Sequence, residues 1–319
     1  MTASGSRVAQ LARVVGWGTV AVLGVAAILR TVAADRTTLL VLAATLTPVL
    51  YLPAWIVAAG AGATRKWRLL VASLLIVAFH VWWTAPVLFG ARGALRHASV
   101  SAKILALNLN ADRPTGGAAA RLIASVDPDL VVLSEASPRS TSGLDVTGYP
   151  VKVADIEPGT NGWMVLSKWP LLDQRRVSIG DRQLPRFEFQ RPDGGRLVLW
   201  QVHPIAPILG QVGKWRRQLV AIRRAVRADE HGRDQAVVAG DFNSTRDIPE
   251  FHDFLDDGWA DAADGHGLFA TWRAGGKLPP LLRLDHILVS RGVGVAWIHR
   301  GRDVGSDHLG VVARLEFRG

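Results

Sequence analysis

The sequence predicts an α/β protein in which packed β-sheets are covered by helices, preceded by three membrane-spanning helices. Residues 1–100 contain three long apolar stretches and almost no acidic side chains. Residues 101–319 instead read as short apolar strands separated by Gly, Pro and Asp turns, with two amphipathic helical patterns among them. A chain of 319 residues has room for a membrane region followed by one large domain. We therefore expect a membrane region over 1–100 and a folded domain over 101–319.

The amino-acid composition limits the kinds of site and partner that the protein can have. The chain has no cysteine, which excludes disulfides, thiolate metal sites and cysteine nucleophiles. Residues 1–100 hold nine of the 37 Lys and Arg residues but one of the 27 acidic residues, so 101–319 carries a net charge of +2 out of the total of +10. Tight binding of a nucleic acid requires several phosphate contacts from Lys or Arg. The charge of the folded domain does not support such a partner.

The three apolar stretches cover about 14–34, 38–61 and 69–89. Each approaches the roughly 20 apolar residues that a helix needs to cross a bilayer. Pro48, Pro53 and Pro86 are expected to be tolerated, since neighbouring helices can satisfy the freed backbone groups. A cleaved signal peptide would be followed by a soluble chain, but here two more apolar stretches follow the first. Buried helices of a soluble protein would carry a charged face, and these stretches have none. We expect a multi-pass protein of the cell membrane, with the lipid bilayer as a partner.

The orientation rests on the basic residues that flank the spans. The dense cluster at 65–68 favours a cytoplasmic loop, which places 101–319 on the other side. Arg92, Arg96 and Lys103 flank the third span and favour the opposite arrangement. The cluster is the denser signal, so we expect an extracytoplasmic domain.

The folded domain shows seven expected strands and two expected helices. The strands are 104–109, 130–133, 163–167, 196–202, 235–239, 284–289 and 311–317. The helices are 118–126 and about 210–228, and the second buries one apolar stripe. Its other face is rich in Lys and Arg, which is typical of a solvated surface or of an anion-binding one.

Polar side chains stand at one end of each of these strands. Asp241 and Asn243 come directly after the strand 235–239 and, being two apart, point to the same side. Turn chemistry alone would explain either residue. The other strand ends repeat the pattern, with Asn108, Asn110, Glu135, Lys168, His203, Asp285, Asp307 and His308. Strand ends that converge at one rim form a site.

The residue types restrict what such a site can do. Carboxylate and amide oxygens suit a magnesium-like cation. His203 and His308 can donate to a phosphate or move protons, and Asp285 can orient His308. The sequence has no Gly-rich phosphate loop, no His-Glu-x-x-His pattern and no Ser-centred nucleophile elbow. The set predicts metal-assisted attack of water on a phosphate ester.

Seven motifs carry a resemblance to a known family. In order they are LALNLN (105–110), DLVVLSE (129–135), WMVLSKWPL (163–171), VHP (202–204), GDFNS (240–244), LDHILVS (284–290) and SDHLGV (306–311). Over about 101–319 the chain resembles the endonuclease/exonuclease/phosphatase superfamily, which has the deoxyribonuclease-I-like fold. The resemblance implies a four-layer α/β (α+β) sandwich, in which two mixed β-sheets pack together between flanking helices and the site lies at their shared rim.

The resemblance also implies a metal and the roles of residues. Glu135 would be the main ligand of Mg²⁺, for which Mn²⁺ is a substitute, with Asn108 and Asp307 beside it. The implied catalytic residues are His203 on the phosphate or the leaving oxygen, Asp241 on the attacking water, Asn243 on the phosphate and Asp241, and Asp285 with His308 as a paired acid/base or transition-state stabiliser.

The remaining implied contacts are to the substrate: Asn110, Lys168, Thr271 and Trp272. Thr271 and Trp272 equally fit a turn threonine and a core tryptophan. The chain departs from the family pattern at Ser134, where Gln is usual, at Lys168, where Arg is usual, and at Pro204, where Leu is common. These departures put specificity in doubt more than catalysis.

The expected function is that of a membrane-anchored, Mg²⁺-dependent phosphoesterase that hydrolyses a phosphodiester or a phosphomonoester. The substrate stays open between nucleic acid, nucleotide and phospholipid head group. The alternative is a non-catalytic, membrane-tethered binding module that retains the fold. A missing ligand would favour that alternative, but every acid and histidine of the pattern is present. The oligomeric state is not predicted.

Overall fold

The computed structural model describes residues 3–229, 235–272 and 279–319 of the chain. It divides the chain into two compact units, which are Met1–Pro86 with Asp247–Pro249, and Val87–Arg246 with Glu250–Gly319. We call them the helical unit and the sandwich unit. The domain boundary that the sequence places at residue 100 stays a prediction.

The helical unit contains two continuous helices that are long and apolar enough to cross a membrane. They are Arg7–Ala33 within α1 (Ala3–Ala33) and the whole of α5 (Trp67–Phe89). Pro86 lies inside α5 without ending it, as expected. The first and third predicted spans thus correspond to single helices.

The second predicted span, 38–61, is wrong as a single straight helix. It is divided into α2 (Thr38–Thr45), α3 (Thr47–Leu50) and α4 (Leu52–Ala63), and the pair Thr38–Thr45 and Thr47–Ala63 bends by 70°. Pro48 and Pro53 stand in the first turns of α3 and α4. Proline lacks the N–H that a continuing helix needs and clashes with the preceding turn, so it begins a helix more readily than it continues one. The described chain therefore has two continuous candidate spans, or three if the bent pair counts as one.

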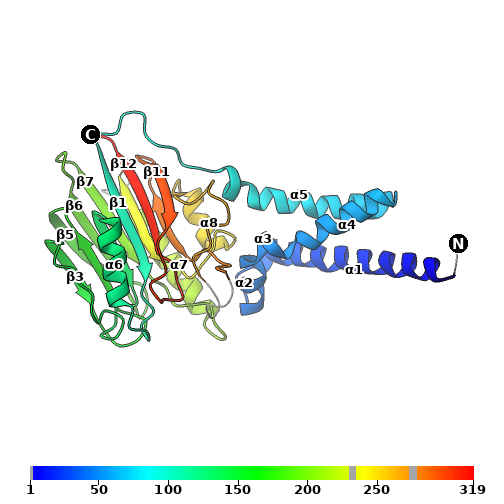
Figure 1. Ribbon diagram of the computed structural model, residues 1–319, viewed down its shortest axis with the longest axis horizontal. Coiled ribbons are helices and arrows are strands. Elements are labelled where there is room, and N and C mark those ends of the chain that lie inside the picture. Colours follow the sequence, from blue (N-terminus) through cyan, green and yellow to red (C-terminus); the bar gives the residue numbers. More distant parts are fainter. Residues whose placement is uncertain (1–2, 230–234, 273–278) are drawn as a thin grey trace. The chain divides into compact units, whose positions relative to one another are not determined.

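The sandwich unit is built from two six-stranded sheets (Figure 1). The first has the strand order β11-β12-β1-β2-β4-β3 and the second has the order β5-β6-β7-β8-β10-β9. The strands of the first sheet are β1 (Val100–Asn108), β2 (Leu130–Ser134), β3 (Val151–Asp155), β4 (Trp163–Ser167), β11 (Val293–Arg300) and β12 (Val311–Phe317). Those of the second are β5 (Leu171–Ser178), β6 (Gln183–Gln190), β7 (Arg196–Val202), β8 (Ala236–Asp241), β9 (Ala260–Asp261) and β10 (Asp285–Val289).

One apolar core lies between the two sheets. It includes Ile104 and Val132 of the first sheet and Leu199, Val237 and Ile287 of the second, all fully buried. Burying each such side chain stabilises the fold by about 1.5–3 kcal/mol relative to leaving it exposed. The alternation of side chains along each strand leaves a second face on each sheet that a helix can cover.

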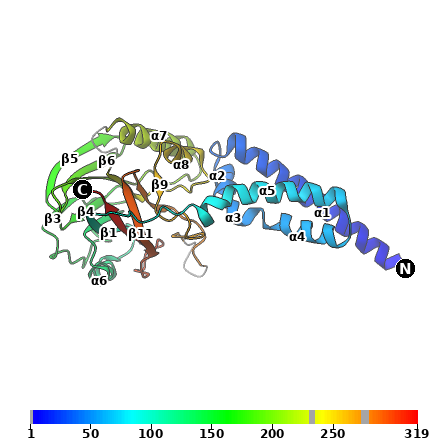
Figure 2. The ribbon, with the colours of Figure 1, turned by 90° about the horizontal axis from the view of Figure 1, so that it is seen from above.

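Three helices cover those outer faces. Leu122 and Ile123 of α6 (Gly116–Val126) pack on Leu105 and Leu133 of the first sheet. Figure 2 shows α6 on one side of the sandwich and α7 (Val212–Ala228) with α8 (Pro249–Asp256) on the other. The buried stripe of α7 is the one that the sequence predicts. The result is the expected four-layer arrangement of helix, sheet, sheet and helix.

Strand direction decides which ends meet. β1 and β2 run parallel, as do β7 and β8, so their carboxyl ends share one rim of the sandwich, which we call the site rim. β10 runs antiparallel to β8 and β12 antiparallel to β1, so these two strands begin at the same rim. β4 is antiparallel to β2 and pairs Ser167 with Leu130. Its carboxyl end therefore lies at the opposite rim.

Candidate active site

Gly240 brings two of the strand ends together. A Cβ atom at this position would lie 2.2 Å from the carbonyl oxygen of Val202, and the φ of 139° is one that other residues rarely adopt. Glycine is thus required where β8 passes close to β7. This approach places His203, which follows β7, beside Asp241 at the end of β8.

Three site residues have a left-handed backbone. Asn110, Glu135 and Asn243 have φ values of 59°, 56° and 47°. Asparagine tolerates this conformation, whereas for glutamate it is strained. The hydroxyl of Ser140 donates to the carbonyl oxygen of Glu135 at 2.7 Å and helps to hold it. Strained residues of this kind cluster at functional sites, which supports a role for Glu135 beyond packing.

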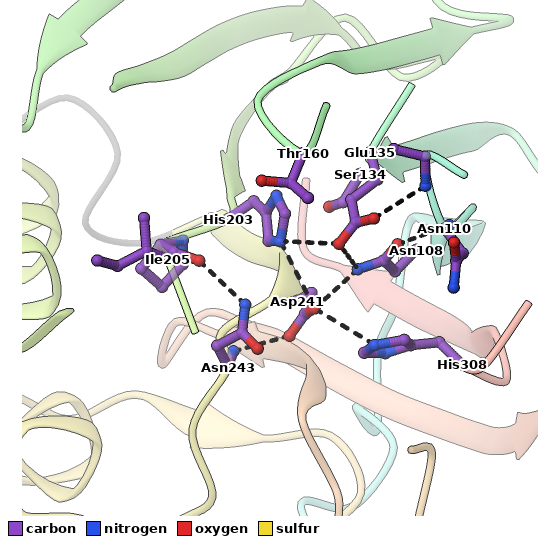
Figure 3. A network of polar contacts seen from close by, with 12 residues as sticks. Asn108, Asn110, Ser134, Glu135, Thr160, His203, Ile205, Asp241, Asn243 and His308 are labelled. Carbon is purple, nitrogen blue, oxygen red and sulfur yellow. Dashed lines mark hydrogen bonds and ion pairs between the residues drawn. The ribbon is translucent and has the colours of Figure 1, made fainter. Parts of the chain in front are cut away.

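The side chain of Asn108 links the two sheets. Its Nδ2 donates to Glu135 Oε1 at 3.0 Å and to Asp241 Oδ2 at 2.9 Å (Figure 3). Its Oδ1 accepts from the backbone N–H of Asn110 at 2.9 Å, so the orientation of the amide is fixed at both ends. One buried amide therefore sets the separation of the two carboxylates.

His203 faces both carboxylates. Its Nε2 lies 3.7 Å from Glu135 Oε1 and 3.7 Å from Asp241 Oδ2. On its other side, Arg182 Nη1 donates to the carbonyl oxygen of His203 at 2.9 Å and lies 3.3 Å from Nδ1. A guanidinium can only donate, so its position favours the tautomer in which Nδ1 accepts and Nε2 carries the proton. Burial and the Arg182 charge hold the pKa of His203 well below its usual range, so the ring is neutral and directs an N–H toward the site.

Asp285 and His308 form the contact that the sequence predicts. His308 Nδ1 lies 2.8 Å from Asp285 Oδ2, and both residues are buried. His308 Nε2 lies 3.7 Å from Asp241 Oδ2, and Figure 3 shows the ring pointing toward Asp241. Although burial opposes the charged form, the carboxylates of Asp285 and Asp241 outweigh it and raise the pKa of His308 to about 10. Burial raises the pKa of Asp241 to about 7, against the attraction of His308.

Asn243 positions Asp241 through its backbone. The N–H of Asn243 donates to Asp241 Oδ1 at 2.7 Å. Its side-chain Nδ2 donates to the carbonyl oxygen of Pro204 at 3.0 Å, which ties the end of β8 to the segment after β7. The predicted contact with Asp241 thus exists, and the main chain makes it.

The three predicted metal ligands offer oxygen atoms of the kind that a hard divalent cation prefers. Glu135 Oε2 accepts from the backbone N–H of Ala111 at 2.9 Å. Asp307 accepts from Asn110 Nδ2 at 2.7 Å and from Trp272 Nε1 at 3.3 Å. Asn110 and Trp272 therefore orient a predicted ligand. Glu135 and Asp307 fit a divalent cation by the chemistry of their oxygens, whereas Asn108 directs its amide nitrogen to the carboxylates and its Oδ1 to the N–H of Asn110.

A second set of residues has a compact spacing. Asp241, Asp285 and His308 each present one potential ligand atom, and these atoms lie within 4.8 Å of one another. However, the 2.8 Å contact occupies His308 Nδ1 with Asp285. A doubly protonated histidine has no lone pair for a metal. The set is better suited to proton handling than to holding a cation.

Two of the predicted substrate-binding residues, Lys168 and Thr271, are not placed to touch a substrate. Lys168 is at the opposite rim, because β4 runs antiparallel to β2, and its Nζ pairs with Asp127 there. Thr271 is fully buried, and its hydroxyl accepts from the backbone N–H groups of Leu284 and Asp285 at 3.1 and 3.2 Å. Thr271 therefore holds Asp285 in place and cannot reach a substrate. The predicted substrate contact by Lys168 is wrong, because Lys168 lies at the rim opposite the site.

Sequence reasoning missed three supporting residues. Arg182 precedes β6 in a segment without a recognisable motif. Thr160 accepts from Arg182 Nη2 at 2.9 Å. The hydroxyl of Ser306 donates to the carbonyl oxygen of Asn108 at 2.7 Å and accepts from His308 N at 3.1 Å. Only Ser306 had a signal in the sequence, since it stands within the SDH motif.

A buried ionic group supports the ends of β8 and β10. His286 Nδ1 lies 2.6 Å from Asp261 Oδ2, and its Nε2 lies 2.9 Å from the carbonyl oxygen of Ser244 and 3.1 Å from that of Arg283. All these partners accept, so the ring donates from both nitrogens. The contact joins the segment after Asn243 to the segment before Asp285 and stabilises the register of the site.

Comparison with known proteins agrees with this geometry. The sequence model of the Endonuclease/Exonuclease/phosphatase family matches residues 105–308. The comparison with curated proteins finds no match.

Several solved structures share the fold. An endonuclease/exonuclease/phosphatase from Beutenbergia cavernae DSM 12333 is similar with a TM-score of 0.55 and 20% identity, over 69% of this chain and 72% of that one. D. rerio TDP2 complexed with a single-strand DNA product has a TM-score of 0.57 and 18% identity, over 68% and 100%. The human Nocturnin catalytic domain with a bound sulfate anion has a TM-score of 0.54 and 16% identity, over 68% and 94%. At these identities the likeness shows the fold.

Proposed function

We propose that this chain, which belongs to the endonuclease/exonuclease/phosphatase family, is a membrane-anchored phosphoesterase that depends on a divalent cation, preferably Mg²⁺. Members of the family are generally hydrolases of phosphoester bonds. One observation carries the proposal for this chain. Asp241 Oδ2 accepts from Asn108 and has an imidazole nitrogen from His203 and from His308 at 3.7 Å on either side. Such an arrangement surrounds a small, highly charged group.

Glu135 and Asp307 would hold the cation, and Asn108 would stand beside them and position the Glu135 carboxylate. When bound, a divalent cation polarises a phosphoryl oxygen and offsets the charge that develops in the transition state. The remaining steps belong to side chains of the chain itself. Neutral His203 donates its Nε2 proton in a hydrogen bond to a phosphate oxygen. Charged His308 stabilises negative charge on the other side of the phosphate.

Asp241 is the base in this scheme. Its buried carboxylate, with the pKa raised to about 7, can accept a proton from an attacking water near neutral pH. The backbone N–H of Asn243 holds one of its oxygens, so the other faces the two histidines. Asp285 keeps His308 oriented and charged.

The anchor and its orientation complete the proposal. The apolar helices α1 and α5 would tether the enzyme to a bilayer, with the sandwich unit on the extracytoplasmic side. Both sources of phosphoester, lipid and soluble, are compatible with such a position.

The test uses the full chain purified in detergent. It should hydrolyse p-nitrophenyl phosphate, bis(p-nitrophenyl) phosphate or both when MgCl₂ is present, and lose that activity in excess EDTA. Asp241→Asn should lower kcat by about 10²-fold or more, as expected for loss of a positioned base. Asp256→Asn, at an exposed residue of α8, serves as the control. Absence of metal-dependent turnover on every phosphoester of a broad panel would refute the proposal.

A further inference from the structure

A cavity of about 250 Å³ lies beside His203 at the site rim. It is bounded by the loop between β3 and β4, by the residues before β6 and by the end of β7. His203 forms a common wall, because its Nδ1 faces Arg182 in the cavity and its Nε2 faces Glu135 and Asp241. His203 is thus the member of the predicted site that lines the cavity, and its side chain alone stands between the cavity and those carboxylates. Drug-sized ligands occupy about 300–1,000 Å³, so this cavity suits a single small ring or chain.

The walls of the cavity are polar. Three amides, Asn161, Gln183 and Gln201, face it together with three carboxylates and the guanidinium of Arg182. Two aromatic rings line the cavity. Trp163 is buried, with the Arg176 guanidinium carbon 5.0 Å from the centre of its ring, and the ring nitrogens of His203 face Arg182 and the two carboxylates. A nucleobase needs an open aromatic face to stack on. This cavity does not provide one.

The charges of the walls are mostly compensated. Asp155 pairs with Arg176 at 2.8 Å, and Asp181 pairs with Lys214. Glu157 has neither a hydrogen bond nor an ion pair within the described ranges 3–229, 235–272 and 279–319. The cavity thus offers one carboxylate whose oxygens accept no hydrogen bond there, although its charge interacts with that of Arg182.

Arg182 offers the complementary donor. It is buried, and its Nη1 is engaged by the carbonyl oxygen of His203. Its Nη1 also donates to the carbonyl oxygen of Thr160 at 3.3 Å, and its Nη2 donates to Thr160 Oγ1. Its buried Nε has no hydrogen-bond partner in the described part of the chain. One small polar cavity therefore contains an unused hydrogen-bond donor on Arg182 and an unused acceptor on Glu157.

These features select a neutral, hydroxyl-rich ligand. A hydroxyl both donates and accepts, so it can bind Glu157 and Arg182 or the amides at once. A cationic head group can only donate and the oxygens of an ionised second phosphate can only accept, so each would satisfy one of the two groups and meet a like charge at the other. We propose that the cavity is a subsite for a neutral polyol group of the substrate, so that the enzyme acts on phosphoesters of a sugar, inositol or glycerol. This inference rests on the proposed function, because it places the phosphate at that same site.

The test measures binding, so it does not depend on turnover. The full chain in detergent with MgCl₂ carries Asp241→Asn, so that probes bind and are not hydrolysed. Four probes are titrated by calorimetry: methyl phosphate, myo-inositol 1-phosphate, ethanolamine phosphate and adenosine 5′-monophosphate. We expect the inositol phosphate to bind about tenfold more tightly than methyl phosphate and more tightly than the other two, as one good hydrogen bond to a charged group would give.

A second substitution assigns the preference to the cavity. Glu157→Gln should lower the ratio of the inositol phosphate and methyl phosphate affinities by about fivefold or more, because a carboxamide binds a hydroxyl more weakly than a carboxylate does. Asp145→Asn, at an exposed carboxylate before β3, should leave that ratio unchanged. Equal affinities for inositol and methyl phosphate, tighter binding of the adenosine or ethanolamine probe, or equal ratios in the two variants would each overturn the subsite. Failure of the proposed function would appear separately, as wild-type protein without metal-dependent hydrolysis of any phosphoester.

Discussion

Replacing Asp261 by Asn tests whether the buried ionic group behind the site holds the sandwich unit together. The Asp261 carboxylate lies 2.6 Å from His286 and 3.7 Å from Arg283 Nε, and both Asp261 and His286 are fully buried. Asparagine has nearly the same shape and can still accept from the backbone N–H of Ala263, which donates to Asp261 Oδ1 at 3.0 Å. The substitution therefore removes charge and leaves volume and most hydrogen bonds in place.

The expected cost follows from the burial of the cations. Removing one partner of a buried ion pair leaves an uncompensated charge and destabilises a protein by about 3–5 kcal/mol. For a domain of this size, 1 kcal/mol corresponds to a change in Tm of about 2–4 °C. Asp261→Asn should thus lower the Tm of the sandwich unit by about 6–20 °C. The measurement is thermal unfolding of the full chain in detergent, followed by the circular dichroism of its β-sheets.

The sign of the pH dependence gives a second check. Burial opposes ionisation of Asp261, but Arg283 and His286 outweigh it and lower the pKa of Asp261 below its usual value. A carboxylate with a depressed pKa contributes stability above the pKa it has in the unfolded chain, about 3.9, and loses it as the pH falls toward the folded value. The difference in Tm between wild type and Asp261→Asn should be constant near neutral pH and shrink below about pH 4.

The chain offers a matched control. Asp256 lies 3.5 Å from His252 one helical turn away, and both side chains are exposed. An exposed pair contributes about 0–1 kcal/mol, so Asp256→Asn should change Tm by no more than about 4 °C. Equal, small shifts for Asp261→Asn and Asp256→Asn would refute the argument that the buried group stabilises the site.

Four further outcomes are expected. Glu135→Gln should abolish Mg²⁺-dependent turnover while leaving the melting curve nearly unchanged, since the side chain is at a strand end; retained turnover at limiting MgCl₂ would remove it from the metal site. Lys168→Ala should leave kcat within about twofold of wild type, because the residue lies at the opposite rim, and a large loss would contradict that placement. Ser178→Cys, the sole cysteine of that variant, should react with an impermeant thiol reagent in intact cells, whereas labelling only after lysis would reverse the proposed orientation. Asp285→Asn and His308→Ala should each lower kcat by about 10²-fold or more, and their combination should be little worse than the second alone; a double variant with the product of the two defects would separate the pair.

The strands that were predicted from the sequence and those that were missed occupy different positions in the sheets. All seven expected strands exist, and their residues are mostly buried on both faces. Four of the five unforeseen strands, β3, β5, β9 and β11, are the four edges of the two sheets. An edge strand needs fewer apolar residues, as the alternating burial of β3 and β5 shows. A search for apolar runs therefore finds the centre of a sheet and misses its edges.

The fifth unforeseen strand has a different cause. β6 contains Pro185, which cannot donate a backbone hydrogen bond and usually argues against a strand interior. The strand forms nonetheless, with Pro185 opposite Arg176 of β5. Its neighbours Phe187 and Phe189 are fully buried between the sheets, and this burial outweighs one lost hydrogen bond.

The candidate site was also only partly predictable from the sequence. Polar residues at strand ends mark candidate site residues, but the sheet topology determines which of them meet. The polar residues at strand ends predicted that Asn108, Glu135 and Asp241 share one site. They do so because β1 runs parallel to β2 and β7 parallel to β8, which brings these ends to one rim. Lys168 also follows a strand, but it lies at the other rim because β4 runs antiparallel to β2. The prediction failed because the direction of a strand cannot be read from the residues at its end.

Arg182 is the reverse case. It has no motif, and it contacts His203 because β6 is antiparallel to β7, which brings the start of one strand beside the end of the other. The contact orients the His203 ring, and both residues line the polar cavity. The residues assigned to chemistry are visible because each belongs to a motif at one end of a strand, as Asp241 ends β8 and Asp285 begins β10. Arg182, which contacts and orients His203, belongs to no such motif.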